Sequence, residues 1–361
     1  MGPYFLMMAL PSVAALVRAR AAGLFFLLVC LVYWVLVAFR FQVGMDWDNY
    51  ILIQHGDYVL PNVHLGDIIA RREPGFGLLS WFAAKIWGGI ILVNVVSAAV
   101  FCTGFFLFAR RCPEPFIAIV VATPLLVIAF AMSGVRQAIA IGIICALFAS
   151  WDRRSLIARV AMVLLASLFH FSAVFVLVFI ALAARLQPLV RAAALGAVFL
   201  LIALTIYIDP TAVSAYSELY VSGQRKLEAP GAIAHVGVIA SAALVYLMNR
   251  RRWARFVGRD PLQTQLAIAA LLSVPFVIVS SVGAYRFALY LWPVAMYVWS
   301  GVPRMIATRP AQTFYRFLIV IASTTMLWGW LTFANNASAW RPYKSWLLQP
   351  DDAPLLRRGR L

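Results

Sequence analysis

The feature that most constrains this chain is a succession of apolar segments, each close to membrane-crossing length and separated by short polar stretches. A helix needs about 20 apolar residues to cross the hydrocarbon core of a bilayer. In lipid, backbone groups must be hydrogen-bonded internally, which favours helices. Of the 361 residues, 64% are hydrophobic and 12% are charged, whereas a soluble domain has about a quarter charged residues. We therefore predict an all-α fold, a polytopic transmembrane helical bundle.

The apolar runs predict about 11 spans plus one half-membrane helix. The half-membrane helix is residues 75–87, which follow Glu73-Pro74 and are too short to cross, so they return to the outer side. Residues 156–169 and 171–184 are also short and are either a hairpin or one long tilted helix; the positions of the arginines favour the hairpin. The expected spans are 22–40, 90–109, 115–132, 136–151, 156–169, 171–184, 192–208, 232–249, 264–281, 285–301 and 317–335.

The net charge of +17 would suggest a nucleic-acid partner in a soluble protein, but here we expect none. Short cytoplasmic loops carry Lys and Arg, and this excess sets the orientation of membrane proteins. Arg18 and Arg20 precede the first clear span, so the N-terminus is predicted inside and loop 41–74 outside. Ten of the 13 acidic residues then fall on the outer side. The basic tail with Arg357, Arg358 and Arg360 also falls outside and opposes this orientation.

The chain divides into three regions on this interpretation. Residues 1–21 are an N-terminal interfacial segment, 22–335 are the transmembrane domain, and 336–361 are an outer-face C-terminal tail. The transmembrane domain carries two large outer loops, 41–74 and 209–231.

The loop 41–74 concentrates the polar chemistry of the chain. It holds five of the 13 acids, namely Asp46, Asp48, Asp57, Asp67 and Glu73. We expect it to form one wall of an active site, to which later helices bring Arg136, His170 and Arg286 on the same face.

Arg136 and Arg286 each stand where an outer turn enters an apolar helix. A charge there is costly near lipid, and a cation at a helix N-terminus opposes the helix dipole unless an anion is present. Two guanidinium groups on one face suit a pyrophosphate, because each binds phosphate oxygens bidentately. The alternative is that both are anchors at the outer headgroups.

Three residues are candidates for a general base, in the order Glu73, His170 and Asp46. The alternatives are a helix-capping role for Glu73, a hydrogen-bonded structural role for His170, and an ordinary solvated charge for Asp46. The spacing of Asp46 and Asp48 could also suggest a metal site, but two carboxylates without a third ligand are weak evidence for one, and metal dependence stays open. Trp47 is either a ring that stacks on sugars or part of the interfacial aromatic belt.

Together these segments resemble the EpsG family, which is related in role to the Wzy-like membrane polysaccharide polymerases. The resemblance covers most of the chain from about residue 22. The residues that carry it are Asp46-Trp47-Asp48-Asn49-Tyr50, Glu73-Pro74-Gly75-Phe76, Ser133-Gly134-Val135-Arg136-Gln137, Phe169-His170-Phe171-Ser172-Ala173, Tyr285-Arg286 and Trp340 to Tyr343.

The resemblance implies an exopolysaccharide or O-antigen repeat-unit polymerase with a scaffold like that of C-type glycosyltransferases. The donor would be an oligosaccharide on undecaprenyl pyrophosphate, transferred to an acceptor sugar hydroxyl at the outer face of the bacterial inner membrane. No cofactor is required. Membrane lipids, a chain-length regulator and other polysaccharide-assembly proteins are the implied partners.

The site residues that the resemblance and the residue chemistry lead us to expect fall into three groups. They are the catalytic candidates Glu73, His170 and Asp46, the pyrophosphate-binding Arg136, Arg286 and Arg72, and the sugar-binding Asp48, Tyr50, Trp47, Gln137 and Tyr285.

Three other functions remain open from the residues alone. A transporter or flippase usually brings polar groups to the membrane midplane and often contains inverted repeats, whereas here the polar residues gather on one face and no repeat is visible. Another outer-face transferase, such as an O-antigen ligase or a membrane acyltransferase, also needs a lipid donor and basic residues, and only the ordered set of motifs favours the polymerase. A non-enzymatic scaffold is disfavoured by Arg136, His170 and Arg286.

Overall fold

The computed structural model describes residues 1–21, 23–54, 64–69, 73–86, 89–183, 187–208, 229 and 231–348. Within these ranges the chain is almost entirely helical, and an isolated antiparallel bridge between Arg40 and Ser345 is the one β-type pairing. The predicted all-α class is therefore confirmed for the part of the chain described.

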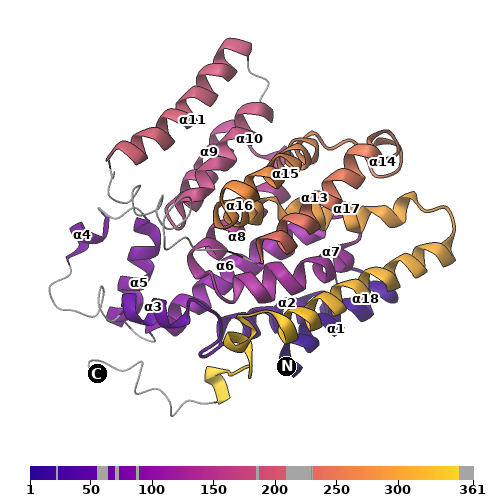
Figure 1. Ribbon diagram of the computed structural model, residues 1–361, viewed down its shortest axis with the longest axis horizontal. Helices are drawn as coiled ribbons and strands as arrows, with labels where there is room; N and C mark the ends of the chain where they lie inside the picture. Colours follow the sequence, from indigo (N-terminus) through magenta and orange to yellow (C-terminus); the bar gives the residue numbers. More distant parts are fainter. Residues whose placement is uncertain are drawn as a thin grey trace.

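Most helices coincide with predicted apolar runs, but the predicted span 285–301 is divided among three shorter helical elements (Figure 1). Those before residue 150 are α1 (Gly2–Leu16), α2 (Leu24–Ala38), α3 (Trp47–Ile53), α4 (Leu65–Ile69), α5 (Pro74–Ile86), α6 (Gly89–Arg111), α7 (Pro115–Ala122), the π-helical η2 (Thr123–Ala131) and α8 (Val135–Ala149). The later ones are α9 (Leu156–Ser167), the 3-10 turn η4 (Phe171–Phe175), α10 (Val176–Ala183), α11 (Pro188–Ile208), α13 (Ala232–Met248), α14 (Arg250–Phe256), α15 (Pro261–Val279), α16 (Ser281–Ala288), α17 (Trp292–Gly301) and α18 (Arg309–Phe333).

Three helices in the described ranges, α6, α15 and α18, are long and apolar enough to cross a membrane. The pair α13 and α14 would add a fourth as one span bent by 80°. The other apolar helices are shorter, so the predicted count of about 11 spans stays a prediction. The half-membrane helix is present as α5, and its depth in the bilayer is likewise a prediction.

Helices α6 and α8 run parallel and touch backbone to backbone. Near their starts, Ser97 Oγ donates to the carbonyl of Val135 at 2.9 Å. In the middle, a Cβ placed on Gly104 would overlap the carbonyl oxygen of Gly142. Small residues allow this approach, which is how membrane helices pack when no hydrophobic force drives them together. The parallel arrangement puts the first turn of α8 at the same end as the start of α6.

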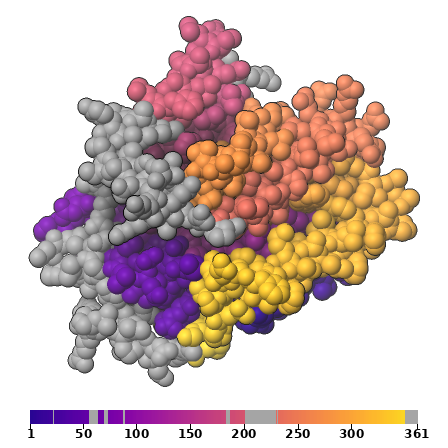
Figure 2. Space-filling model, viewed as in Figure 1, coloured from indigo at the N-terminus to yellow at the C-terminus, as the bar shows by residue number. Residues whose placement is uncertain are grey.

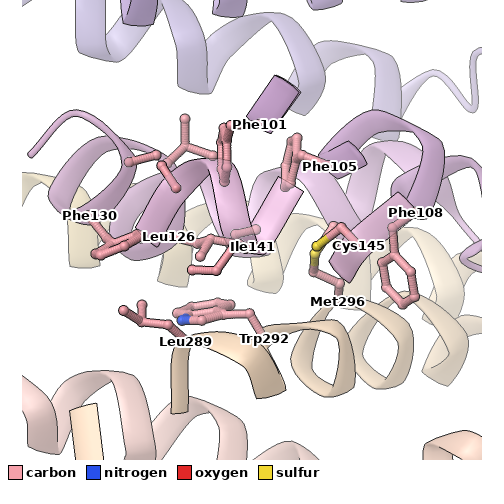
Figure 3. Close-up of a cluster of buried hydrophobic side chains, with 14 of the residues drawn as sticks. Phe101, Phe105, Phe108, Leu126, Phe130, Ile141, Cys145, Leu289, Trp292 and Met296 are labelled. Atoms are coloured by element: carbon pink, nitrogen blue, oxygen red, sulfur yellow. The ribbon is translucent and has the colours of Figure 1, made fainter. Parts of the chain in front are cut away.

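The centre of the bundle is filled by aromatic and aliphatic side chains from helices far apart in the sequence (Figure 3). Phe101 and Phe105 come from α6, Phe130 from η2, Ile141 from α8 and Trp292 from α17, and all are buried. Many close contacts of this kind sum to a large dispersion energy. This packing holds the starts of α8 and α16 in fixed relative positions.

The opposite end of α6 carries ion pairs. Arg111 pairs with Asp152 at 2.7 Å and with Asp260 at 3.5 Å, and the buried Arg316 forms a two-pronged pair with Glu114 at 2.5 and 2.7 Å. Glu114, Asp152 and Asp260 are the three acids that the predicted orientation leaves inside. In Figure 1, α14 lies towards this end of the long axis and α3, α4 and α5 lie at the other.

The chain turns back at His170, so residues 156–183 form a hairpin, as predicted, and not one long helix. Helix α9 ends at Ser167, the His170 backbone is extended with φ −153° and ψ 113°, and α10 packs against α9. His170 thereby lies at the tip of the hairpin.

Both ends of the described chain pack onto the bundle. Residues 334–348 lie along 39–47, where Trp346 N donates to Phe39 O at 2.8 Å and Phe41 N donates to Lys344 O at 3.0 Å; Figure 2 shows this yellow segment beside the violet one. Tyr4 of α1 donates to Trp340 O at 2.7 Å. The interfacial position of residues 1–21 and the outer position of 336–361 remain predictions.

Candidate active site

Glu73 is the point at which three distant segments meet. It directly precedes Pro74, and Gly75 N donates to Leu168 O at 2.9 Å, which presses the start of α5 onto the tip of the α9–α10 hairpin. A Cβ on Gly75 would lie 3.0 Å from the carbonyl oxygen of Leu168. As a result Glu73 Oε1 lies 2.6 Å from His170 Nδ1, and Oε2 lies 2.9 Å from Arg136 Nη1.

The Glu73 carboxylate is charged and fully engaged. Burial raises its pKa, but the hydrogen bond with His170, the charge of Arg136 and a 3.3 Å hydrogen bond from Phe171 N outweigh this and lower the pKa to about 2. Since a guanidinium stays protonated at all relevant pH values, Arg136 keeps Glu73 ionised even beside a neutral imidazole. A carboxylate of this kind is a weak proton acceptor.

His170 has one nitrogen satisfied and one without a partner. Its side chain is 13% exposed, and burial lowers its pKa because the imidazolium is desolvated; the Glu73 carboxylate opposes this shift. The neutral ring therefore donates Nδ1–H to Glu73 and carries its lone pair on Nε2. Nε2 is buried and has no hydrogen-bond partner in the described structure, which is costly unless a ligand supplies one.

Arg136 lies in the first turn of α8, and its side chain is 41% exposed beside Glu73. Its guanidinium lies over the rings of Tyr50 and Phe76, at 5.8 and 5.7 Å from their centroids. Tyr50 OH also accepts a long hydrogen bond of 3.5 Å from the Arg136 backbone N–H. The packing of α3 and α5 thus orients the guanidinium, while a ligand can still reach it.

Arg286 is brought to the same place from α16. Gln137 Nε2 donates to the backbone carbonyl of Arg286 at 2.7 Å, and the charges of Arg286 and Arg136 both act on His170 to lower its pKa. Ser280 Oγ caps α16 by accepting from Gly283 N at 3.1 Å. Arg286 therefore lies near His170, but in the last turn of α16 and not at the helix start that the sequence predicted; that the two arginines share one membrane face stays a prediction.

Asp46 lies on the edge of this group. Its carboxylate accepts from Ser133 Oγ at 3.3 Å, and its backbone N–H donates to the same oxygen. Gly44, with φ +105°, allows the approach, since a Cβ there would overlap the Met132 carbonyl oxygen. In the described structure no hydrogen bond joins Asp46 to Glu73 or His170.

The predicted sugar-binding residues are distributed around the site. Trp47 is 6% exposed and packs edge-on against Phe41, at 5.5 Å, and Asp48 beside it is exposed. Gln137 and Tyr50 are buried and engaged with the backbone of Arg286 and with Arg136. Tyr285 packs among aromatic rings, 4.7 Å from His235.

His235 was not singled out from the sequence. It is buried in the first turn of α13, and its Nδ1 accepts from Trp292 Nε1 at 3.1 Å. The one signal for it was a histidine at the start of an apolar helix directly after an outer loop.

Several predicted features lie outside the described residues. They are Arg72, Asp57, most of the outer loop 209–231, and the tail beyond residue 348. The role of Arg72 in pyrophosphate binding therefore stays a prediction.

Comparison with known proteins gives one family match. The model of a family described as the EpsG family matches residues 23–345, nearly the whole chain. No curated protein and no solved structure matches the chain.

Proposed function

The chain belongs to the EpsG family, and on this basis we propose that it is an exopolysaccharide or O-antigen repeat-unit polymerase. Membership indicates a membrane protein of polysaccharide biosynthesis with glycosyltransferase-like activity. The proposed donor is an oligosaccharide on undecaprenyl pyrophosphate, and the proposed acceptor is a sugar hydroxyl on another lipid-linked unit. The reaction would take place at the outer face of the inner membrane.

The observation that carries this proposal is the group formed by Arg136, Arg286, Glu73 and His170. The group contains two guanidinium ions, those of Arg136 and Arg286, whose charges both act on the His170 ring. Such a site favours an anionic ligand, and guanidinium forks match phosphate oxygens. A pyrophosphate leaving group gains charge as its bond to the sugar breaks, so cations placed there lower the barrier.

In the proposed step the acceptor hydroxyl oxygen bonds to the anomeric carbon of the donor sugar. The bond from that carbon to the pyrophosphate oxygen breaks, and its electron pair leaves with undecaprenyl pyrophosphate. The hydroxyl proton passes to a base.

Of the three base candidates, the geometry supports His170 best. Its Nε2 lone pair has no described partner, whereas both oxygens of Glu73 are engaged. Glu73 then acts as a positioning residue, which holds the Nδ1–H tautomer and stabilises the imidazolium that forms. Asp46 is the less favoured alternative, because its carboxylate faces Ser133.

The proposed sugar contacts are divided by burial. Asp48 and Trp47 line an open pocket and are in reach of a bound sugar. Tyr50, Gln137 and Tyr285 are packed against the arginines or the core. We therefore expect them mainly to hold Arg136 and Arg286 in position.

The test is reconstitution of the purified full chain in liposomes with a lipid-linked oligosaccharide repeat unit. A polymerase converts the units into a ladder of longer glycans and releases undecaprenyl pyrophosphate. Translocation of the units without joining them would instead identify a flippase, and transfer to an unrelated acceptor alone would identify a ligase.

A further inference from the structure

An open pocket of about 450 Å³ lies at the N-terminal end of α3, separate from the group around Glu73. One wall is the chain just before α3 and its first turn, and the facing wall is the C-terminal segment. The residues that line it are Gln42, Gly44, Met45, Trp47, Asp48 and Ala339.

The walls of this pocket are held together by defined hydrogen bonds. Gly44 N donates to Ala339 O at 2.9 Å. The next residue, Trp340, is 1% exposed and donates from Nε1 to Ile128 O at 2.9 Å. Lys344 Nζ donates to Gln42 Oε1 at 2.8 Å, which fixes the amide and leaves its N–H₂ donors for a ligand. Hydrogen bonds therefore hold the C-terminal segment, residues 334–348, in place as one wall of the pocket.

The chemistry of the lining suits a sugar better than a phosphate. Asp48 offers carboxylate acceptors, Gln42 offers amide donors, and the indole of Trp47 offers an apolar surface. Hydroxyl groups donate and accept hydrogen bonds, and the C–H face of a pyranose is apolar, so these three groups complement it. Among the described lining residues Asp48 carries the one formal charge, and it is negative.

The pocket is close to the proposed reaction centre. Tyr50, which lies under the Arg136 guanidinium, follows Trp47 by three residues on α3, a rise of about 4.5 Å. Asp46, between the pocket and α8, contacts Ser133 in the turn that precedes Arg136. Successive turns of α3 thus reach the pocket and the Arg136 guanidinium.

We propose that this pocket is the acceptor subsite, which binds the sugar at the growing or incoming end that supplies the attacking hydroxyl. The inference rests on the proposed polymerase function and adds the place of the second substrate. Asp48 and Gln42 hold the sugar hydroxyls, and the small exposed edge of Trp47 borders the sugar. The lipid-linked donor stays at Arg136 and Arg286.

The test measures the KM for the acceptor and the KM for the donor separately. Reconstituted full-length protein is given a lipid-linked donor and, as acceptor, the same oligosaccharide repeat unit without its lipid. Asp48→Asn and Gln42→Ala are each expected to raise the KM for the acceptor about tenfold, the effect of losing one strong hydrogen bond. The donor KM and the rate at saturating acceptor should stay within about twofold.

Asp67→Asn is the matched control, because Asp67 is another exposed carboxylate of the same loop but does not line the pocket. An unchanged acceptor KM in both pocket variants, or an equal rise in the donor KM, would overturn the proposal.

Direct binding of the lipid-free oligosaccharide to the detergent-solubilised protein tests the pocket independently of catalysis. Binding that is weakened in Asp48→Asn and kept in Asp67→Asn supports the subsite, and equal binding in both rejects it. If the wild-type protein binds the oligosaccharide but forms no polymer, the polymerase function fails while the subsite stands.

Discussion

The Gln137 side chain donates a hydrogen bond of 2.7 Å to the backbone carbonyl of Arg286, although 149 positions separate them in the chain. This bond ties the first turn of α8 to α16 and sets Arg136 and Arg286 around His170. The consequence is a cationic site whose parts come from four elements, α5, α8, the α9–α10 hairpin and α16.

Replacing Arg136 by Lys is expected to lower polymer formation about a hundredfold, as loss of one transition-state donor does. Lysine keeps the charge but cannot contact Glu73 and a phosphate with a planar fork. The rate is measured with lipid-linked repeat units at equal amounts of folded protein. Arg251→Ala, an exposed arginine of α14, is the control and should keep the wild-type rate; a fully active Arg136→Lys would rule out the bidentate role.

The pH dependence of the polymerisation rate should reflect the protonation of His170. A base with a lowered pKa is available at neutral pH and is lost as protonation sets in, so the rate should fall on the acid side below about pH 6.5. The groups that face the ring are Glu73, Arg136 and Arg286. Because the Glu73 carboxylate raises the pKa of His170, Glu73→Gln should move this acid limb to lower pH as well as lower the rate. An acid limb that stays in place in Glu73→Gln contradicts the assignment.

The lowered pKa of His170 also predicts how the stability of the fold depends on pH. The folded pKa of His170 lies below its unfolded value, so the unfolded chain binds the proton first and stability should decrease as pH falls below about 6.5. In His170→Gln this part of the acid destabilisation should be absent. Thermal unfolding in detergent at several pH values measures it, and an identical pH profile in wild type and variant would be inconsistent with a buried neutral imidazole.

The close contact between Gly104 and Gly142 predicts that a larger side chain at this point strongly destabilises the fold. Gly104→Val would force α6 and α8 apart and should cost about 3 kcal/mol, the upper range for overpacking. A Cβ added at Gly329 in α18 would meet no atom within 4 Å, so Gly329→Ala should be neutral or slightly stabilising. Thermal unfolding of both variants tests the pair; equal midpoints would argue against the close crossing.

The Glu114–Arg316 pair should matter for stability but not for chemistry. Arg316 has a side-chain exposure of 4%, and removal of one partner of a buried pair leaves an uncompensated charge that costs about 3 kcal/mol. Arg316→Met should therefore reduce folded yield while the polymerisation rate per folded molecule is unchanged. A specific loss of rate at full yield would place this end of the bundle in the mechanism.

Much of the site could be predicted because polar residues are conspicuous in an apolar chain. Glu73, Arg136, His170 and Arg286 each interrupt or open an apolar run, and the orientation rule puts them on one face. Their pairing could not be predicted, because it depends on how α5 meets the hairpin through Gly75 and Leu168. That contact is what turns Glu73 from the first-ranked base into a partner of His170.

Other features depend on long-range packing that leaves little trace in the sequence. His235 sits inside an apolar helix and resembles any core residue until Trp292 is seen to donate to it. The C-terminal segment joins residues 39–47 through backbone hydrogen bonds, which carry no residue preference. The predicted span 115–132 corresponds to α7 continued by η2, but the π-helical form of η2 could not be predicted from its apolar sequence.

The most direct measurement is the conversion of a labelled undecaprenyl-pyrophosphate-linked repeat unit by the purified protein in liposomes, with wild type, Arg286→Ala and His170→Gln compared at equal folded protein. We expect wild type to form a glycan ladder and to release one undecaprenyl pyrophosphate for each new linkage, and both variants to form little or no ladder. A His170→Gln protein that forms the wild-type ladder, or a wild-type protein that releases no lipid pyrophosphate, would contradict the account.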